Sequence, residues 1–159
     1  MRDQFFNPES IAVVGATPKK GKVGNTLLKN ILSFHRKAKG SVRIYAVNPK
    51  YDKILNVLCY PSVLQIEEGV SLAVIAVPAT SVPEVLEQCG LKGIKNVVVI
   101  SAGFKEAGRE GAVLESELIR ISAKYGLSLV GPNCVGLINT HSDLNATLSN
   151  TWLRTMKPK

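Results

Sequence analysis

The stretch SIAVVGATPKKGKVGN, residues 10–25, decides which fold this chain is expected to adopt. Its apolar, β-branched run from Ile11 to Val14 predicts a strand that is buried on both faces. The run ends at Gly15, a loop rich in glycine and lysine follows, and a helical pattern begins after Gly24. A strand, a glycine-rich loop and a helix form the phosphate-binding turn of a βαβ unit, where backbone N–H groups and the helix dipole attract an anion. We therefore predict that this loop binds a phosphate group.

Three lysines strengthen this prediction, whereas the spacing of the glycines limits it. Lys19, Lys20 and Lys22 add full positive charges to the loop. The glycines of the loop are spaced more widely than in the dinucleotide fingerprint G-x-G-x-x-G. The pattern alone therefore leaves open a second interpretation, in which the loop is only a tight connection between strand and helix.

Size and composition predict one globular domain. The chain has 159 residues, 45% of them hydrophobic, which is enough to bury a core. No apolar run approaches the roughly 20 residues that span a bilayer, and residues 1–4 lack a secretory pattern. The three cysteines are far apart, which disfavours a disulfide framework or a zinc site and favours a reducing cytoplasm. The formal net charge of +8 favours an anionic partner without identifying it.

Strands and helices alternate along the rest of the chain. We expect strands at residues 11–14, 42–47, 72–77, 96–100 and 127–130, a short strand or turn pair within 54–60, and helices between the main strands. This alternation predicts an α/β, Rossmann-like fold: a doubly wound parallel sheet of about five strands with helices on both faces. Numbering the five main strands along the chain, we expect the order 3-2-1-4-5. Residues 139–159 have weak periodicity and are expected to form a linker or tail after a domain of residues 1–138.

Small, polar or turn-forming residues follow every expected strand, and the carboxyl ends of parallel strands are where such sheets bind ligands. These ends are Gly15-Ala16-Thr17, Asn48-Pro49-Lys50, Val77-Pro78-Ala79, Ser101-Ala102-Gly103 and Gly131-Pro132-Asn133. An NAD site would place an acidic residue at the second of them, to hold the ribose hydroxyls. Asn48 and Lys50 stand there instead. Because a lysine attracts a phosphorylated ribose, NADP and coenzyme A remain as ligands.

Several segments, taken in order, resemble a known family. They are residues 6–16, the loop 19–24, Val77-Pro78-Ala79, residues 101–106 and residues 131–136. Together they are similar to the N-terminal CoA-binding domain of nucleoside-diphosphate-forming acyl-CoA synthetases, above all the ADP-forming acetyl-CoA synthetases and more distantly the alpha subunit of succinyl-CoA synthetase. The resemblance covers residues 5–148 and implies a Rossmann-like domain that holds coenzyme A along its strand ends.

The resemblance also implies roles for individual residues. Residues of the loop would hold the phosphates, with Gly21 and Gly24 letting backbone N–H groups approach them, and Lys50 would meet a phosphate of CoA. Ile100, Ser101 and Ala102 would line the nucleotide, and Pro78 and Ala79 would form another wall. The complete set of expected CoA-binding residues is Gly15, Thr17, Lys19, Lys20, Gly21, Lys22, Val23, Gly24, Asn48, Lys50, Val77, Pro78, Ala79, Ile100, Ser101, Ala102 and Asn133.

In this family the reaction passes through a phosphohistidine on a following domain, and the nucleotide binds to a further, ATP-grasp domain. The two histidines of this chain, His35 and His141, do not stand in such a setting. Cys134 is the only residue that we consider as a nucleophile. Because the sequence offers no histidine partner for it, we interpret Cys134 as structural. We therefore expect a CoA-binding domain or subunit that holds CoA for thioester formation from an acyl phosphate. Alone it is expected to be inactive, with no catalytic residue and no metal, and its partners would be the remaining synthetase domains or subunit.

Two other functions stay open at this point. An NAD(P)-binding regulatory or redox module would share the fold and similar glycines. A nucleic-acid binder is suggested only by the charge, because aromatic residues are 6% of the chain and form no stacking platform. Neither the acyl substrate nor the oligomeric state can be inferred from the sequence.

Overall fold

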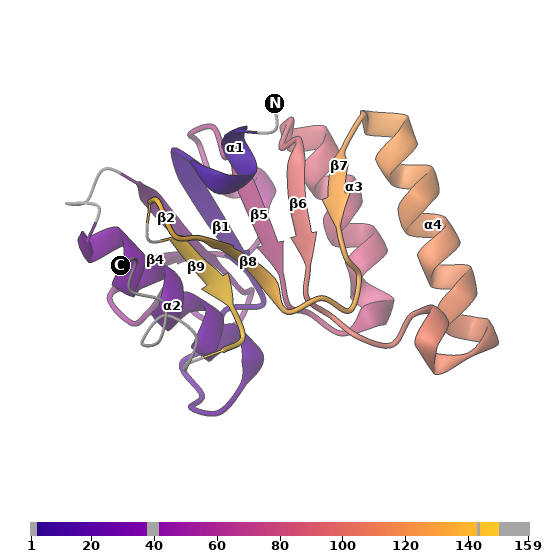
Figure 1. The fold of residues 1–159 in the computed structure, drawn as a ribbon, viewed down its shortest axis with the longest axis horizontal. Coiled ribbons are helices and arrows are strands. Elements are labelled where there is room, and N and C mark those ends of the chain that lie inside the picture. Colours follow the sequence, from indigo (N-terminus) through magenta and orange to yellow (C-terminus); the bar gives the residue numbers. More distant parts are fainter. Residues whose placement is uncertain (1–2, 38–41, 143, 150–159) are drawn as a thin grey trace.

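A computed structural model describes residues 3–37, 42–142 and 144–149 (Figure 1). Its helices are α1 (Asp3–Phe6), α2 (Val23–Lys37), α3 (Val82–Lys92) and α4 (Arg109–Tyr125). Its strands are β1 (Ser10–Val14), β2 (Arg43–Val47), β3 (Lys53–Ile54), β4 (Val57–Tyr60), β5 (Leu72–Ile75), β6 (Asn96–Val99), β7 (Ser128–Val130), β8 (Gly136–Asn139) and β9 (Leu144–Thr147). Single 3-10 turns occur at Val63–Gln65, Ala79–Ser81 and Lys105–Ala107.

The main sheet has seven strands in the order β3-β4-β2-β1-β5-β6-β7. Every neighbouring pair is parallel except β3 and β4, which form an antiparallel hairpin at one edge. Helices lie on both faces (Figure 1). The prediction of a doubly wound, Rossmann-like α/β fold is therefore confirmed.

The expected strand order was wrong at one position. We expected the strand at 72–77 to lie beyond 42–47, but β5 pairs with β1, and β4 takes the outer place beside β2. The reason is burial. All four residues of β5 are buried, whereas in β4 only Cys59 is, and Leu58 is 59% exposed. A strand that is apolar on both faces belongs in the middle of a sheet, and a half-buried strand can lie near the edge.

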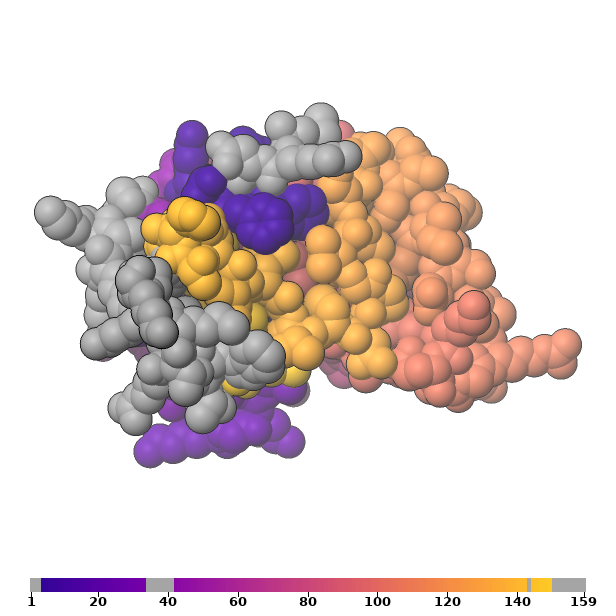
Figure 2. Space-filling model, in the orientation of Figure 1, coloured from indigo at the N-terminus to yellow at the C-terminus, as the bar shows by residue number. Residues whose placement is uncertain are grey.

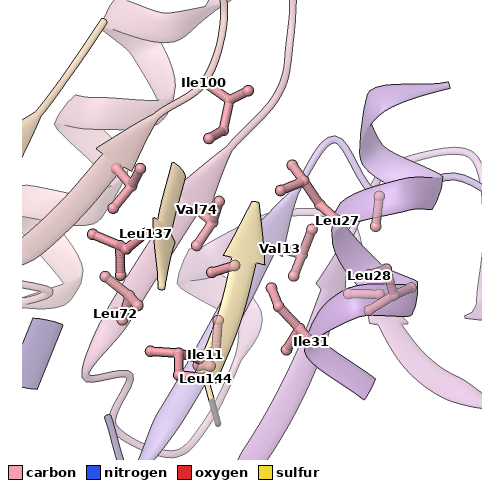
Figure 3. Packing of buried hydrophobic residues seen from close by; sticks show 14 of the residues in the cluster. Ile11, Val13, Leu27, Leu28, Ile31, Leu72, Val74, Ile100, Leu137 and Leu144 are labelled. Carbon is pink, nitrogen blue, oxygen red and sulfur yellow. The ribbon is translucent and has the colours of Figure 1, made fainter. Parts of the chain in front are cut away.

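The two faces of the sheet are covered by different elements. Ile11 and Val13 of β1 point to one face and their neighbours to the other, because side chains alternate along a strand. Helix α2 and the hairpin β8–β9 cover the first face, and α3 and α4 cover the second (Figure 1). Figure 3 shows the first face, where buried residues of β1 and β5 meet α2 and the hairpin. The labelled residues there include Ile11, Val13, Leu27, Leu28, Ile31, Leu72, Val74, Leu137 and Leu144.

The hairpin β8–β9 extends into residues 139–159, for which we expected a linker or tail. Its strands pair in antiparallel register from Gly136 opposite Thr147 to Asn139 opposite Leu144. All four residues of β9 are buried, and Asn30 of α2 donates a hydrogen bond to the Thr147 carbonyl at 2.8 Å. The segment is packed because Leu144 and Ala146 alternate with polar residues that bond to each other or to the backbone. The rest of the expected tail, residues 150–159, lies outside the described residues.

The hairpin also contacts the start of the chain. The Asn139 side chain donates a hydrogen bond to the Phe6 carbonyl at 2.9 Å, and Ser142 donates to the same carbonyl at 3.3 Å. In Figure 2 the yellow and orange residues of the hairpin lie beside the dark indigo N-terminal residues on one face of the molecule. These contacts join segments more than 130 positions apart in the sequence.

Residues that commonly begin or end helices stand at the ends of α3 and α4. Gly126 caps the end of α4 in the left-handed conformation with φ of 62°. Ser81 stands at the start of α3 with Pro83 in the first turn, and the Ser81 side chain makes no capping hydrogen bond. Within the described residues, no helix combines the length and the apolar character that crossing a bilayer requires.

The burial of the hairpin can be tested with a leucine pair. Leu144 is fully buried, so Leu144→Ala should lower the free energy of unfolding by about 2–5 kcal/mol. Leu91 of α3 is 66% exposed, and the matched change Leu91→Ala should alter it by less than about 0.5 kcal/mol. Urea denaturation measures both. Equal stabilities of the two variants would mean that residues 144–147 are not part of the core.

Candidate functional site

Two clefts open at the carboxyl ends of the central strands. The first, of about 540 Å³, lies between the ends of β1 and β2 and the start of α3. The second, of about 800 Å³, lies between the ends of β1, β5 and β6, the start of α2 and the segment before the hairpin. Gly15, Thr17, Lys50, Val77 and Pro78 line both clefts. One extended ligand can therefore pass from one cleft into the other.

Glycine is required at the end of β1 and in the first turn of α2 for steric reasons. Gly15 has φ of 89°, a conformation that favours glycine, and a Cβ there would overlap the Ala76 carbonyl of the neighbouring strand end. A Cβ on Gly24 would overlap the Gly15 carbonyl. Gly24 thus lets the first turn of α2 rest directly on the loop that follows β1.

This geometry revises the role expected for the loop glycines. We expected Gly21 and Gly24 to serve the approach of backbone N–H groups to phosphate. Gly24 lines the second cleft, but its close packing on Gly15 is reason enough for a glycine there. Gly21 has φ of 79° with open space around it, so it serves the turn of the loop and lines neither cleft.

Asparagine side chains hold the loop in place. The Asn25 amide donates to the Thr17 carbonyl at 2.9 Å, and the Asn48 amide donates to the Ala16 carbonyl at 2.8 Å. The Asn48 side-chain oxygen in turn accepts a hydrogen bond from the Lys50 N–H at 2.9 Å. Asn48 therefore connects the end of β2 to the loop after β1.

The clefts are lined by more positive than negative charge. Lys19 and Lys50 line the first cleft, and Lys22 and Lys50 line the second. Among the described residues that line them, Glu84 is the only acidic one. The first turn of α2 also reaches the second cleft, and the leading N–H groups of a helix have no partners within the helix. Both features favour an anion at this place.

All but three of the residues expected to bind CoA line one cleft or both, and the exceptions are Lys20, Gly21 and Ala79. Ile100, Ser101, Ala102 and Asn133 lie on the second cleft, away from the wall formed by α3. The Ser101 hydroxyl donates to the Val77 carbonyl at 2.5 Å, and the Asn133 N–H donates to the Ser101 carbonyl at 2.9 Å. These bonds join three strand ends into one wall.

Sequence reasoning missed several lining residues, and most of those outside the strand ends fall into two groups. One is a stripe on and before α3, at helical spacing: Ser81, Glu84, Val85 and Gln88. That spacing, directly after a strand end already assigned to the ligand rim, was a usable signal. The other group is Val135 and Leu148, which flank the hairpin strands and reach the second cleft only through its folding. No local signal in the sequence marks these two.

Cys134 lines the second cleft, but its thiol is directed to the protein. The sulfur donates a hydrogen bond to the Val99 carbonyl at 3.3 Å, and burial raises the pKa of the Cys134 thiol. A raised pKa makes the nucleophilic thiolate scarcer at neutral pH. The structural interpretation of this cysteine agrees with these contacts.

The described residues contain no cluster of three or more His, Cys, Asp or Glu side chains that could hold a metal ion. His141 is exposed in the turn between β8 and β9, where its N–H donates to the Asn139 side chain at 3.0 Å. The side chain of His35 lies outside the described part of α2.

Known protein sequences similar to this chain are CoA-binding domains and ADP-forming acetate–CoA ligases. Residues 9–140 match a family described as a CoA binding domain. The chain is 55% identical over 147 residues to ADP-forming acetate–CoA ligase I of Archaeoglobus fulgidus, covering 92% of this chain and 21% of that protein. It is 45% identical to the alpha subunit of ADP-forming acetate–CoA ligase II of Pyrococcus furiosus, covering 92% of this chain and 31% of that subunit.

A solved structure of a related enzyme is similar to this chain in both sequence and fold. The dinucleotide-forming acetyl-coenzyme A synthetase 1 of Ca. Korarchaeum cryptofilum, solved with phosphate and ADP, superposes with a TM-score of 0.85 at 40% identity. The match covers 93% of this chain and 31% of that one. The chain thus spans about a fifth to a third of the length of these relatives.

The packing role of Gly24 gives a second stability test. Gly24→Ala should lower the free energy of unfolding by about 1–3 kcal/mol or more, because the new methyl group meets backbone that cannot move freely. A Cβ added to Gly69 would meet nothing within 4 Å, and Gly69 has no positive φ, so Gly69→Ala should change stability by less than about 1 kcal/mol. Thermal and urea unfolding compare the two. A Gly24→Ala variant as stable as wild type would contradict the close packing.

Proposed function

This chain belongs to the CoA-binding domain family, and on that premise we propose that its two clefts hold one molecule of coenzyme A. The observation that carries the proposal is the junction of the clefts. There Gly15, Thr17 and Lys50 line both hollows, beside the first turn of α2. CoA consists of a phosphorylated nucleotide and a pantetheine arm joined by a pyrophosphate. A junction with Lys50 and the leading N–H groups of α2, flanked by Lys19 and Lys22, suits the pyrophosphate.

The character of each cleft supports an orientation for the ligand. The first cleft has polar and ring-bearing walls that suit an adenosine, supplied by Pro49, Tyr51 and Gln88. The second cleft has aliphatic walls that suit the pantetheine arm, supplied by Val23, Ile100, Val135 and Leu148. We therefore assign Ile100, Ser101 and Ala102 to the pantetheine arm, whereas from the sequence we expected them to line the nucleotide.

The position of Lys50 favours CoA over NAD. An NAD site needs a carboxylate after the second strand of the sheet to hold the ribose hydroxyls. Here the Asn48 side chain forms hydrogen bonds with the backbone of the protein, and Lys50 is exposed at the rim of both clefts. We propose that Lys50 contacts the ribose phosphate or the pyrophosphate of CoA.

The reaction that this binding serves would need more than this chain. The relatives are ADP-forming acetate–CoA ligases, several times longer than the matched region. We propose that the chain presents CoA for thioester formation from an acyl phosphate. The phosphohistidine and the ATP-grasp function would belong to further domains or a further subunit, and the isolated chain would not complete the reaction.

Calorimetric titration with four ligands tests the proposed function. CoA should bind more tightly than dephospho-CoA, NAD and NADP, because only CoA combines the pyrophosphate, the 3′-phosphate and the pantetheine arm. Tighter binding of NADP or NAD would instead favour a nicotinamide-nucleotide module. The absence of binding to all four ligands would reject both functions.

The role of Lys50 has its own test. Lys50→Glu should weaken CoA binding about ten- to a hundredfold, since it replaces a charge-assisted contact by repulsion. Dephospho-CoA should lose less than CoA if the partner of Lys50 is the 3′-phosphate, and as much if it is the pyrophosphate. Lys95→Glu makes the same change in net charge at the opposite end of the strands and serves as the control. Unchanged affinity of the Lys50 variant would remove this lysine from the site.

A further inference from the structure

Two asparagine amides hold the peptide units on either side of Thr17. Asn48, at the end of β2, donates to the carbonyl of Ala16, and Asn25, near the start of α2, donates to the carbonyl of Thr17. The Asn25 side chain is nearly inaccessible, with Asn25 only 1% exposed. Two separate elements thus fix the backbone at one residue of the loop.

Fixing the Ala16 carbonyl also fixes an N–H group. In a planar trans peptide the C=O and the N–H point in opposite directions. The carbonyl of Ala16 and the N–H of Thr17 belong to the same peptide unit. When Asn48 binds that carbonyl, it therefore sets the direction of the Thr17 N–H.

The Thr17 side chain is oriented in a similar manner. Its hydroxyl oxygen accepts a hydrogen bond from the Lys19 N–H at 3.3 Å. A hydroxyl that accepts in this way still has its own proton to donate. Thr17 lines both clefts, so this residue stands where they meet.

Bound carbonyls matter at an anion site because a free carbonyl oxygen repels a phosphate. Thr17 is followed by Pro18, which has no N–H, so the peptide unit between them offers an anion only its oxygen. Asn25 binds that oxygen and holds it toward the buried side of α2. The two carbonyls on either side of Thr17 are thus occupied by amide donors and do not face an anion as free acceptors.

We propose that Asn25 and Asn48 are positioning residues for anion binding, which act by fixing the backbone around Thr17 so that its N–H and hydroxyl serve as donors to a phosphate. The proposal rests on the proposed function for the identity of the ligand, CoA. It does not require contact between either asparagine and the ligand, and it replaces the contact that we expected for Asn48 from the sequence.

Three variants separate this role from a general effect on folding. Asn48→Ser keeps a local acceptor for the Lys50 N–H but is too short to reach the Ala16 carbonyl. Asn25→Leu keeps the volume and removes the amide. Asn30→Leu is the matched control, because Asn30 lies on the same helix and its amide binds the Thr147 carbonyl of the hairpin, outside both clefts.

Inorganic pyrophosphate is the first probe, titrated into the ¹⁵N-labelled chain well below its unfolding temperature and followed by NMR. In wild type the Thr17 amide resonance should shift on titration. Asn48→Ser and Asn25→Leu should each raise the Kd for pyrophosphate about tenfold. Asn30→Leu should raise it less than twofold, even if its unfolding temperature falls as much.

The outcomes distinguish this inference from the proposed function. A wild-type Kd in Asn48→Ser, or an equal loss of affinity in Asn30→Leu, would overturn the positioning role. Asn48 is half-buried, so its serine variant tests the positioning role if Asn25→Leu does not fold.

CoA titrated into the same proteins is the second probe. If wild type binds pyrophosphate at Thr17 but not CoA, the proposed function fails and the positioning role stands; if pyrophosphate does not shift Thr17, the positioning role fails whatever CoA does.

Discussion

The contact between the first turn of α2 and the backbone of Gly15 is the constraint on which the rest of the site depends. Neither Gly24 nor Gly15 has room for a side chain, because a Cβ on either would overlap a carbonyl of a neighbouring segment. This contact places the start of α2 directly over the end of β1. The intervening loop must then bulge outward, with Gly21 in the left-handed conformation at its turn. Lys19 and Lys22 of that loop are exposed at the rim of the clefts as a result.

The sheet brings the remaining parts of the site to the same place. Parallel strands have their carboxyl ends at one edge, and the chain changes direction between β1 and β5, which leaves a crevice there. Hydrogen bonds between the segments that follow the strands make this edge rigid: Asn48 binds the loop after β1, and Ser101 connects the segments after β5 and β6. Such cross-links hold the donors in one arrangement before a ligand arrives, which lowers the entropic cost of binding.

The hairpin β8–β9 has two roles in this arrangement. Its inner face completes the core over β1 and β5, where Leu137 and Leu144 take the place that a helix would have in a more regular doubly wound fold (Figure 3). Its ends carry Val135 and Leu148 to the wall of the second cleft. The same segment therefore contributes to the stability of the core and to the aliphatic wall of the second cleft.

The sequence by itself determined the fold class, the loop after β1 and most of the residues at the strand ends, because these depend on local signals. Burial on both faces, the glycine and lysine content of residues 15–24, and turn residues after each strand are all properties of short segments. These signals leave NADP and CoA open as ligands, and the family resemblance favours CoA.

Only the tertiary structure decided how these segments are arranged. The place of β5 beside β1, the packing of β9, the close contact of Gly24 and the hydrogen bonds of Asn48 each depend on a partner outside the local segment. The sequence does not distinguish a glycine needed for close packing from a glycine needed for phosphate binding. It also does not distinguish an asparagine that binds a carbonyl from one that binds a ligand. The distinction lies in which atoms come within bonding distance, and that is settled by the packing of helix on sheet.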